Sequence, residues 1–253
     1  MEESPGSYAC LSLNTFLQEL VENDYYVDYC VKVDLPGTKK RWKFVLSSNE
    51  NDEDSQQTPG APPAQPLPNE DTGGLAGLRY IAEKSMLRNI HFDVGVKTST
   101  PLNPYTRARF RKIWLPDPWL FRLTEQLYWF NDTGAGLLSR LDIERKLSEK
   151  WFGRSTSEAD YKERIEEWYL SQTFGVYRRV AKRQAQNLEW QIIATDADNT
   201  KVSYYIYRLR WRINFWRDWL FVEASPQILY DRERDFRSSL GLYLSVEAMF
   251  GNF

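Results

Sequence analysis

Arginines repeated at every second position are the residues of this chain with the clearest chemical potential. Three stand in TRARFRKIW at residues 106–114, and three stand in SYYIYRLRWRINF at residues 203–215. Because side chains on a strand alternate between two faces, the members of each triplet share one face. We call these triplets the first arginine ladder (Arg107, Arg109, Arg111) and the second arginine ladder (Arg208, Arg210, Arg212). Guanidinium groups in such rows attract anions or form ion pairs with carboxylates.

Carboxylates on the polar faces of other alternating segments could neutralise the ladders. With two further arginines, this charged set comprises Arg122, Arg140, Asp93, Asp142, Glu144, Glu189, Glu223 and Glu247. Two interpretations remain open. Either the charges pair and fill an interior, or opposed cationic rows line a passage that prefers anions. The net charge of -2 gives no indication of a nucleic-acid partner.

The sequence contains few residues in patterns that are typical of catalytic sites. The single histidine, His91, lies in IHFDVGVK on the polar face with Asp93. No serine stands in a recognisable nucleophile motif. Asp142 and Glu144 could do acid–base chemistry, but beside Arg140 they are more typical of structural ion pairs. No glycine-rich phosphate loop or metal-ligand spacing occurs, so we predict no cofactor, no metal site and no enzymatic activity.

The segments that carry these charges alternate between polar and apolar residues. In residues 203–215 a continuous apolar face stands behind the arginines, formed by Tyr205, Tyr207, Leu209, Trp211, Ile213 and Phe215. Counted from Trp42, similar segments give about 12 strands of the length that a tilted transmembrane strand needs. The pattern predicts an all-β fold, a closed antiparallel transmembrane β-barrel. Closure removes the unpaired sheet edges that lipid cannot satisfy.

The N-terminal part is predicted to differ from the barrel. We interpret residues 1–39 as a periplasmic segment that contains a short helix and one strand. The helix is expected at residues 11–22 because apolar residues stand there at helical spacing, namely Leu13, Phe16, Leu17 and Leu20. The strand is expected at residues 25–35, where polar and apolar side chains alternate.

The barrel is expected to take residues 40–253. An acidic and then proline-rich stretch at residues 48–76 cannot bury a core, and it is predicted to be a disordered external loop. Cys10 and Cys30 match no metal-binding spacing. They form one disulfide bond, as suits an exported protein, or they remain two free thiols.

Aromatic residues near strand ends favour a membrane environment for the barrel. The tryptophans at these positions are typical of the belts at membrane–water interfaces: Trp114, Trp119, Trp129, Trp151, Trp168, Trp216 and Trp219. The alternative is a soluble β protein in which these rings pack beside turns and the arginine faces meet water. An outer solvated face would usually carry more lysine than arginine, so we favour the transmembrane interpretation.

The end of the chain resembles Gram-negative outer-membrane β-barrel proteins. The resemblance rests on residues 220–251, which end in LGLYLSVEAMFG, and on the terminal aromatic residue Phe253. In that class a final amphipathic strand with aromatic residues, here Phe250 and Phe253, is read by the assembly machinery. PLNPYTRARFRKIWL and the short turns also resemble proteobacterial outer-membrane proteins. The chain begins MEESPGSYAC without an export signal, so an outer-membrane location implies that a signal peptide has been removed.

This resemblance covers roughly residues 40–253 and indicates a class rather than an activity. We expect a structural or partner-binding membrane component with a charged, largely plugged lumen. Its expected partners are outer-membrane lipid and lipopolysaccharide, the assembly machinery and, as a further candidate, another envelope protein. The alternative is a narrow, anion-preferring channel, because small 12-stranded sugar-acid porins resemble this chain in their lumenal arginine rows. A lipid-modifying enzyme is disfavoured, since 12-stranded outer-membrane phospholipases use an outward histidine and His91 faces the other way.

Overall fold

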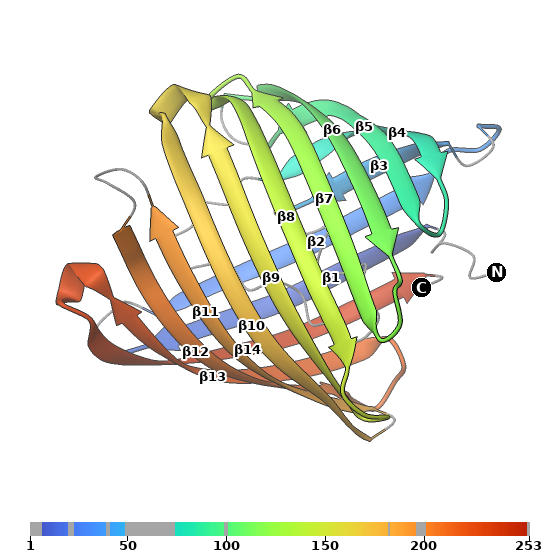
Figure 1. The fold of residues 1–253 in the computed structure, drawn as a ribbon. Coiled ribbons are helices and arrows are strands. Elements are labelled where there is room, and N and C mark those ends of the chain that lie inside the picture. The colour runs from blue at the N-terminus through green and yellow to red at the C-terminus, as the bar shows by residue number, and fades with distance from the viewer. Residues whose placement is uncertain are drawn as a thin grey trace.

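The chain folds into one closed antiparallel β-barrel (Figure 1). The structure is a computed structural model that describes residues 7–19, 23–38, 41–48, 74–98, 101–181, 183–195 and 201–251. Within those residues fourteen strands pair with their sequence neighbours, and the ring closes where β1 pairs with β14. The all-β barrel architecture that the sequence predicts is therefore confirmed.

The strands have similar lengths, except for a short β3. Their bounds are β1 Tyr8–Gln18, β2 Asp24–Asp34, β3 Trp42–Ser47, β4 Leu75–Lys84, β5 Arg88–Lys97, β6 Asn103–Trp114, β7 Trp119–Phe130, β8 Gly134–Lys146, β9 Trp151–Lys162, β10 Glu167–Ala181, β11 Gln184–Thr195, β12 Lys201–Asn214, β13 Leu220–Asp231 and β14 Arg237–Gly251. Two single turns of 3-10 helix, Glu163–Ile165 and Arg232–Arg234, precede β10 and β14. In the described part of the chain, no helix is long and apolar enough to cross a membrane.

Because the number of antiparallel strands is even, β1 begins and β14 ends at the same end of the barrel. Tyr8 at the start of β1 pairs with Gly251 at the end of β14. We call this end the terminus end. The other, which carries the β1–β2, β7–β8 and β13–β14 connections, is the opposite end (Figure 1).

Side chains divide between lumen and outer surface as strand alternation requires. On β12, Arg208 and Arg210 point inward and are buried, whereas Leu209 and Trp211 between and beside them point outward and are exposed. Large apolar side chains are exposed around the whole ring. A water-soluble fold would bury such a continuous apolar surface, whereas a transmembrane barrel turns it toward lipid.

The predicted count of about 12 strands and the predicted N-terminal helix are both wrong. Residues 11–18 belong to strand β1, in which Leu11 and Leu13 face outward while Asn14 and Phe16 face inward. Phe16 and Leu17 therefore lie on opposite faces, which a helical stripe does not allow. The strand forms because it pairs with both β2 and β14 and leaves no open edge in the ring.

The two strands missing from the predicted count are β1 and β2, which the sequence interpretation placed in a separate segment at residues 1–39. Both lie in the barrel wall. Most of the predicted loop at residues 48–76 falls outside the described residues, although Leu75 and Ala76 at its end belong to β4. The disulfide bond between Cys10 and Cys30 is confirmed, and it joins directly paired residues of β1 and β2.

Two apolar clusters lie in the barrel interior near the opposite end, where buried polar residues such as Gln18 and Ser239 also occur. One buried apolar cluster contains Tyr105, Tyr128 and Phe130, and a second contains Ile193, Ile206 and Leu229. Each cluster draws on the strand ends that meet at the opposite end. Charged side chains also reach this end, where Lys97 pairs with Asp132 and Asp160 accepts a hydrogen bond from Tyr128.

Candidate functional site

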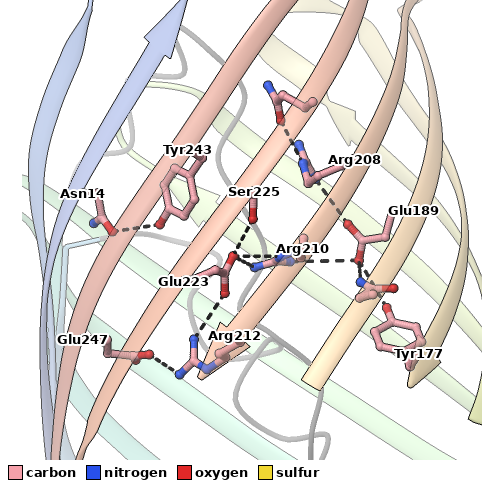
Figure 2. A network of polar contacts seen from close by, with 12 residues as sticks. Asn14, Tyr177, Glu189, Arg208, Arg210, Arg212, Glu223, Ser225, Tyr243 and Glu247 are labelled. Carbon is pink, nitrogen blue, oxygen red and sulfur yellow. Dashed lines mark hydrogen bonds and ion pairs between the residues drawn. The ribbon is translucent and has the colours of Figure 1, made fainter. Parts of the chain in front are cut away.

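The second arginine ladder lies on β12 between carboxylates of the neighbouring strands (Figure 2). Arg208 stands opposite Glu189 of β11 in the strand register. Its Nη1 lies 3.4 Å from Glu189 Oε2, and its Nε donates a hydrogen bond of 2.9 Å to Gln227 Oε1. The register of three adjacent strands thus supplies this guanidinium with acceptors on both sides.

Arg210 is the centre of this network. Its Nε and Nη2 lie 2.9 and 2.8 Å from Glu223 Oε1, and its Nη1 lies 4.0 Å from Glu189 Oε1. Arg212 contacts the other oxygen of Glu223 at 3.5 Å and also pairs with Glu247 of β14. Glu223 and Glu189 therefore each bridge two arginines, so the second arginine ladder is matched by carboxylates.

Neutral side chains fill the remaining hydrogen-bonding positions of the network. Ser225 Oγ donates to Glu223 Oε1 at 3.1 Å, and Tyr177 Oη donates to Glu189 Oε1 at 3.3 Å. Arg210 and Glu223 are only 3% and 2% exposed. Buried charges of this kind are stable only when they are paired and hydrogen-bonded, so the network holds β11 to β14 in one arrangement.

A separate pair of hydrogen bonds crosses the closure of the barrel onto β1 and β2. Tyr243 Oη donates to Asn14 Oδ1 at 2.8 Å, and Asn14 Nδ2 donates to Asp28 Oδ2 at 2.8 Å. Sequence reasoning missed both Asn14 and Tyr243. Alternation of polar and apolar residues could have assigned Asn14 of β1 and Tyr243 of β14 to the lumen. In residues 11–18, however, the apolar residues also fit a helical period.

The first arginine ladder lies on β6 and is organised by Asp93 of β5. Asp93 accepts hydrogen bonds from Arg107 Nε and Nη2 at 2.9 and 2.7 Å. It also accepts from Arg79 Nε and Nη2 at 2.6 and 2.7 Å. One buried carboxylate is thus clamped by two bidentate guanidiniums, and Arg79 on β4 was not among the residues predicted from the sequence.

Farther along β6, the first arginine ladder meets neutral side chains rather than carboxylates in the register. Arg109 Nε and Nη2 donate to Gln126 Oε1 of β7 at 3.0 and 2.7 Å. Arg111 stands opposite Thr124 of β7 and is half-buried. These two positions differ from the second arginine ladder, where strand pairing places glutamates beside the arginines.

Two carboxylates of β8 form ion pairs with the next group of arginines. Asp142 lies 3.5 Å from Arg122 Nη1 and 3.4 Å from Arg140 Nε. Glu144 lies 3.5 Å from Arg122 Nη1 and 2.9 Å from Arg154 Nη2. Asp142 and Glu144 are therefore bridging ion-pair partners.

Charge is distributed unequally between the two sides of the lumen. Among the described inward-facing residues of β4 to β9, arginines outnumber acidic residues. The arginines are Arg79, Arg107, Arg109, Arg111, Arg122, Arg140 and Arg154, and the acidic residues are Asp93, Asp142, Glu144, Glu158 and Asp160. On β11 to β14, three arginines face three glutamates.

His91 faces the lumen and is buried, and its Nδ1 lies 3.0 Å from Asn89 Oδ1. In the strand register His91 stands between Ile81 of β4 and Arg109 of β6. Among the described residues, no group of three His, Cys, Asp or Glu side chains could hold a metal ion.

The predicted interface aromatics are all exposed and lie near strand ends. Five belong to the terminus end (Trp114, Trp119, Trp151, Trp216, Trp219), and two belong to the opposite end (Trp129, Trp168). At the terminus end several pair with cations, as when Arg145 lies 4.9 Å from the Trp119 ring centroid. Phe250 packs on Trp219 with ring centroids 5.1 Å apart, whereas Phe253 lies outside the described residues.

Comparison with known proteins identifies the fold but no sequence family. The sequence matches no protein-family model and no curated protein. Outer-membrane expressed OmpT of Vibrio cholerae is similar in structure, with a TM-score of 0.56, 9% identity, and 99% of each chain covered. A bacterial polysaccharide outer membrane secretin has a TM-score of 0.55 at 10% identity, covering 97% of this chain and 99% of the other.

The outer membrane channel DcaP of Acinetobacter baumannii is similar with a TM-score of 0.50 and 8% identity over 96% of each chain. At such low identities a structural likeness speaks to fold and not to activity. The chain therefore has the fold of Gram-negative outer-membrane β-barrel proteins.

Proposed function

We propose that the chain is an integral outer-membrane β-barrel that acts as a structural or partner-binding component with a closed, charged lumen. The observation that carries this proposal is the burial of two arginines in each arginine ladder. Arg107, Arg109, Arg208 and Arg210 are each between 3% and 5% exposed. A water-filled passage would leave such side chains accessible, because solvated arginines on a channel wall contact water.

The proposed location follows from the outer surface and the fold. Exposed apolar side chains around the ring fit lipid, and exposed tryptophans at both ends fit the two interfaces. Outer-membrane lipid, lipopolysaccharide and the assembly machinery are the proposed partners, with another envelope protein as a further candidate. We assign no catalytic step, because the described lumenal carboxylates and His91 are engaged in ion pairs and hydrogen bonds.

The second candidate function is a narrow, anion-preferring channel. The excess of arginine on β4 to β9 specifically favours it, since a wall with more guanidinium than carboxylate raises the local concentration of anions. The first arginine ladder is the candidate selectivity element, because its three arginines face the lumen from this wall.

Conductance in planar lipid bilayers separates the two functions. The folded barrel is expected to give no discrete current steps. Reproducible steps would overturn the closed lumen and support the channel. In that case Arg109→Ser with Arg111→Ser is expected to shift the reversal potential toward cation preference. Lys112→Ser is the matched control, because Lys112 follows Arg111 on β6 but faces outward. An equal shift from both variants would reject the ladder as the selectivity element.

A further inference from the structure

A cluster of polar side chains interrupts the apolar outer surface on β7 to β10 (green to yellow in Figure 1). We call it the outer polar patch, and it comprises Glu125, Ser139, Ser155, Ser157 and Gln172. These residues alternate with inward-facing neighbours: Thr124 and Gln126 on either side of Glu125 are buried in the lumen. Leu127, Leu137 and Phe174 next to the patch are exposed, as expected for a face toward lipid.

The patch lies at the middle of the barrel wall. Each of its residues is within two positions of the midpoint of its strand. This depth corresponds to the hydrocarbon core, where lipid offers no hydrogen-bonding partner. Polar side chains at such positions are costly when they face lipid, and they commonly mark contacts between protein surfaces.

Hydrogen bonds within the patch use only part of its capacity. Ser139 Oγ donates to Glu125 Oε1 at 2.8 Å. Ser157 Oγ donates to Gln172 Oε1 at 2.5 Å, and Gln172 Nε2 donates to Ser155 Oγ at 2.9 Å. Within the described part of the chain, Glu125 Oε2 and the second amide hydrogen of Gln172 take no such bond. The patch therefore keeps one strong acceptor on β7 and one strong donor on β10.

The sizes of the side chains fit contact with another convex wall. Two barrels touch along a line and diverge on both sides of it, so small residues suit the centre and long residues suit the flanks. Between Trp151 and Tyr161, the outward residues of β9 are small, namely Gly153, Ser155, Ser157 and Ala159. On β8, the outward Ser139 stands between Leu137 and Leu141. Glu125 and Gln172 flank them on β7 and β10. Small residues that permit close approach, with polar groups beside them, are typical of contacts between membrane-embedded surfaces.

We propose that the outer polar patch binds a second copy of this chain about a two-fold axis that runs between β8 and β9. Such an axis places β8 against β9 and β7 against β10 of the other copy. The carboxylate of Glu125 then accepts from the amide of Gln172 of the second copy, and symmetry repeats the contact. A two-fold axis along the membrane normal keeps each residue at its own depth. Glu125 and Gln172 each lie within two positions of the midpoint of their strands, so their long side chains come close enough in depth to meet.

A second copy fits better than a different protein because the patch contains both halves of the hydrogen-bonded pair. An interface with another protein would need only one of them. The inference rests on the proposed membrane location and is independent of whether the lumen is closed. A chain that stays folded and soluble without detergent would overturn the location itself, whereas the tests below address the patch in lipid.

Cross-linking tests the position of the axis. Ser139→Cys and Ser157→Cys are placed on two differently tagged copies, which are reconstituted together in lipid vesicles and oxidised. We expect a covalent dimer that carries both tags. The matched control pairs Leu13→Cys with Val246→Cys, which are outward and exposed on β1 and β14. Absence of the mixed dimer, or equal cross-linking in the control, would overturn the proposal. So would cross-linking of Ser157→Cys in native membranes to a different protein only.

An exchange of the paired residues tests the contact itself. Gln172→Glu places two carboxyl groups opposite each other and removes both symmetric contacts. At about threefold per contact, the loss of two contacts is expected to lower the association constant of the dimer in detergent about ninefold. Adding Glu125→Gln exchanges donor and acceptor and is expected to restore the dimer. Heat-modifiable gel migration reports whether each barrel is folded. A folded Gln172→Glu chain that dimerises normally, or a folded double variant that does not recover, would refute the pairing.

Discussion

Replacing Glu223 with glutamine is expected to destabilise the barrel more than any comparable change at an exposed ion pair. Glu223 contacts Arg210 at 2.8 Å and Arg212 at 3.5 Å, and both Arg210 and Glu223 are buried. Glutamine keeps the shape and one acceptor oxygen but removes the charge. Two guanidinium groups then lose the carboxylate that they share, and Glu189 and Glu247 are left to balance all three arginines of β12.

The magnitude follows from the burial of these groups. Removing one partner of a buried ion pair typically costs about 3–5 kcal/mol, because the remaining charge is desolvated without compensation. Glu83→Gln is the matched control: Glu83 lies 2.6 Å from Arg88, but both side chains are substantially exposed. Exposed pairs contribute about 0–1 kcal/mol, so the two identical substitutions should differ clearly.

Reversible urea unfolding in lipid vesicles, followed by tryptophan fluorescence, measures the difference. Glu223→Gln is expected to lower the urea midpoint by about 1–2 M, with a much smaller effect from Glu83→Gln. Adding Arg210→Gln should recover part of the loss, because one of the uncompensated charges is removed. If Glu223→Gln and Glu83→Gln have the same effect, the second arginine ladder does not stabilise the barrel through buried ion pairs.

Two further predictions concern the barrel wall. Replacing Cys10 and Cys30 together with alanine should lower the free energy of unfolding by about 3 kcal/mol, because the disulfide closes a separation of 20 residues; an unchanged urea midpoint would contradict this. Gly95→Ala should destabilise by about 3 kcal/mol, since a Cβ there would lie 2.1 Å from the carbonyl oxygen of Ala76 on the paired strand. Gly153→Ala is its control, because the nearest atom to a Cβ there is 3.7 Å away, and an equal loss of heat-modifiable folded protein in both variants would refute the steric explanation.

The arginine ladders show which features can be predicted from the alternation of residues within one strand. Alternation in residues 203–215 correctly assigned Arg208 and Arg210 to one face and Leu209 and Trp211 to the other. Closure into a barrel then made the arginine face the lumen. The side chains that stand beside each arginine depend on strand register, which places Glu189 opposite Arg208 and Gln126 opposite Arg109. No spacing within one segment contains that information.

The N-terminal strands show where local pattern fails. Leu13, Phe16 and Leu17 fit a helical stripe as well as part of a strand, and the segment became a strand because it closes the ring. Its partner β14 lies at the other end of the chain, as in the pairing of Tyr8 with Gly251. The spacing of residues 11–18 does not show that this segment must pair with so distant a strand.

The class of fold could be predicted from the sequence, because a period of two in polar and apolar residues runs through most of its strands. The same period showed which side chains share a face, as in residues 203–215. The number of strands, the pairing of Cys10 with Cys30, and the carboxylates that each arginine of β12 contacts became known only from the folded barrel. These depend on contacts between strands, and the closed ring fixes those contacts only when every edge has found its partner.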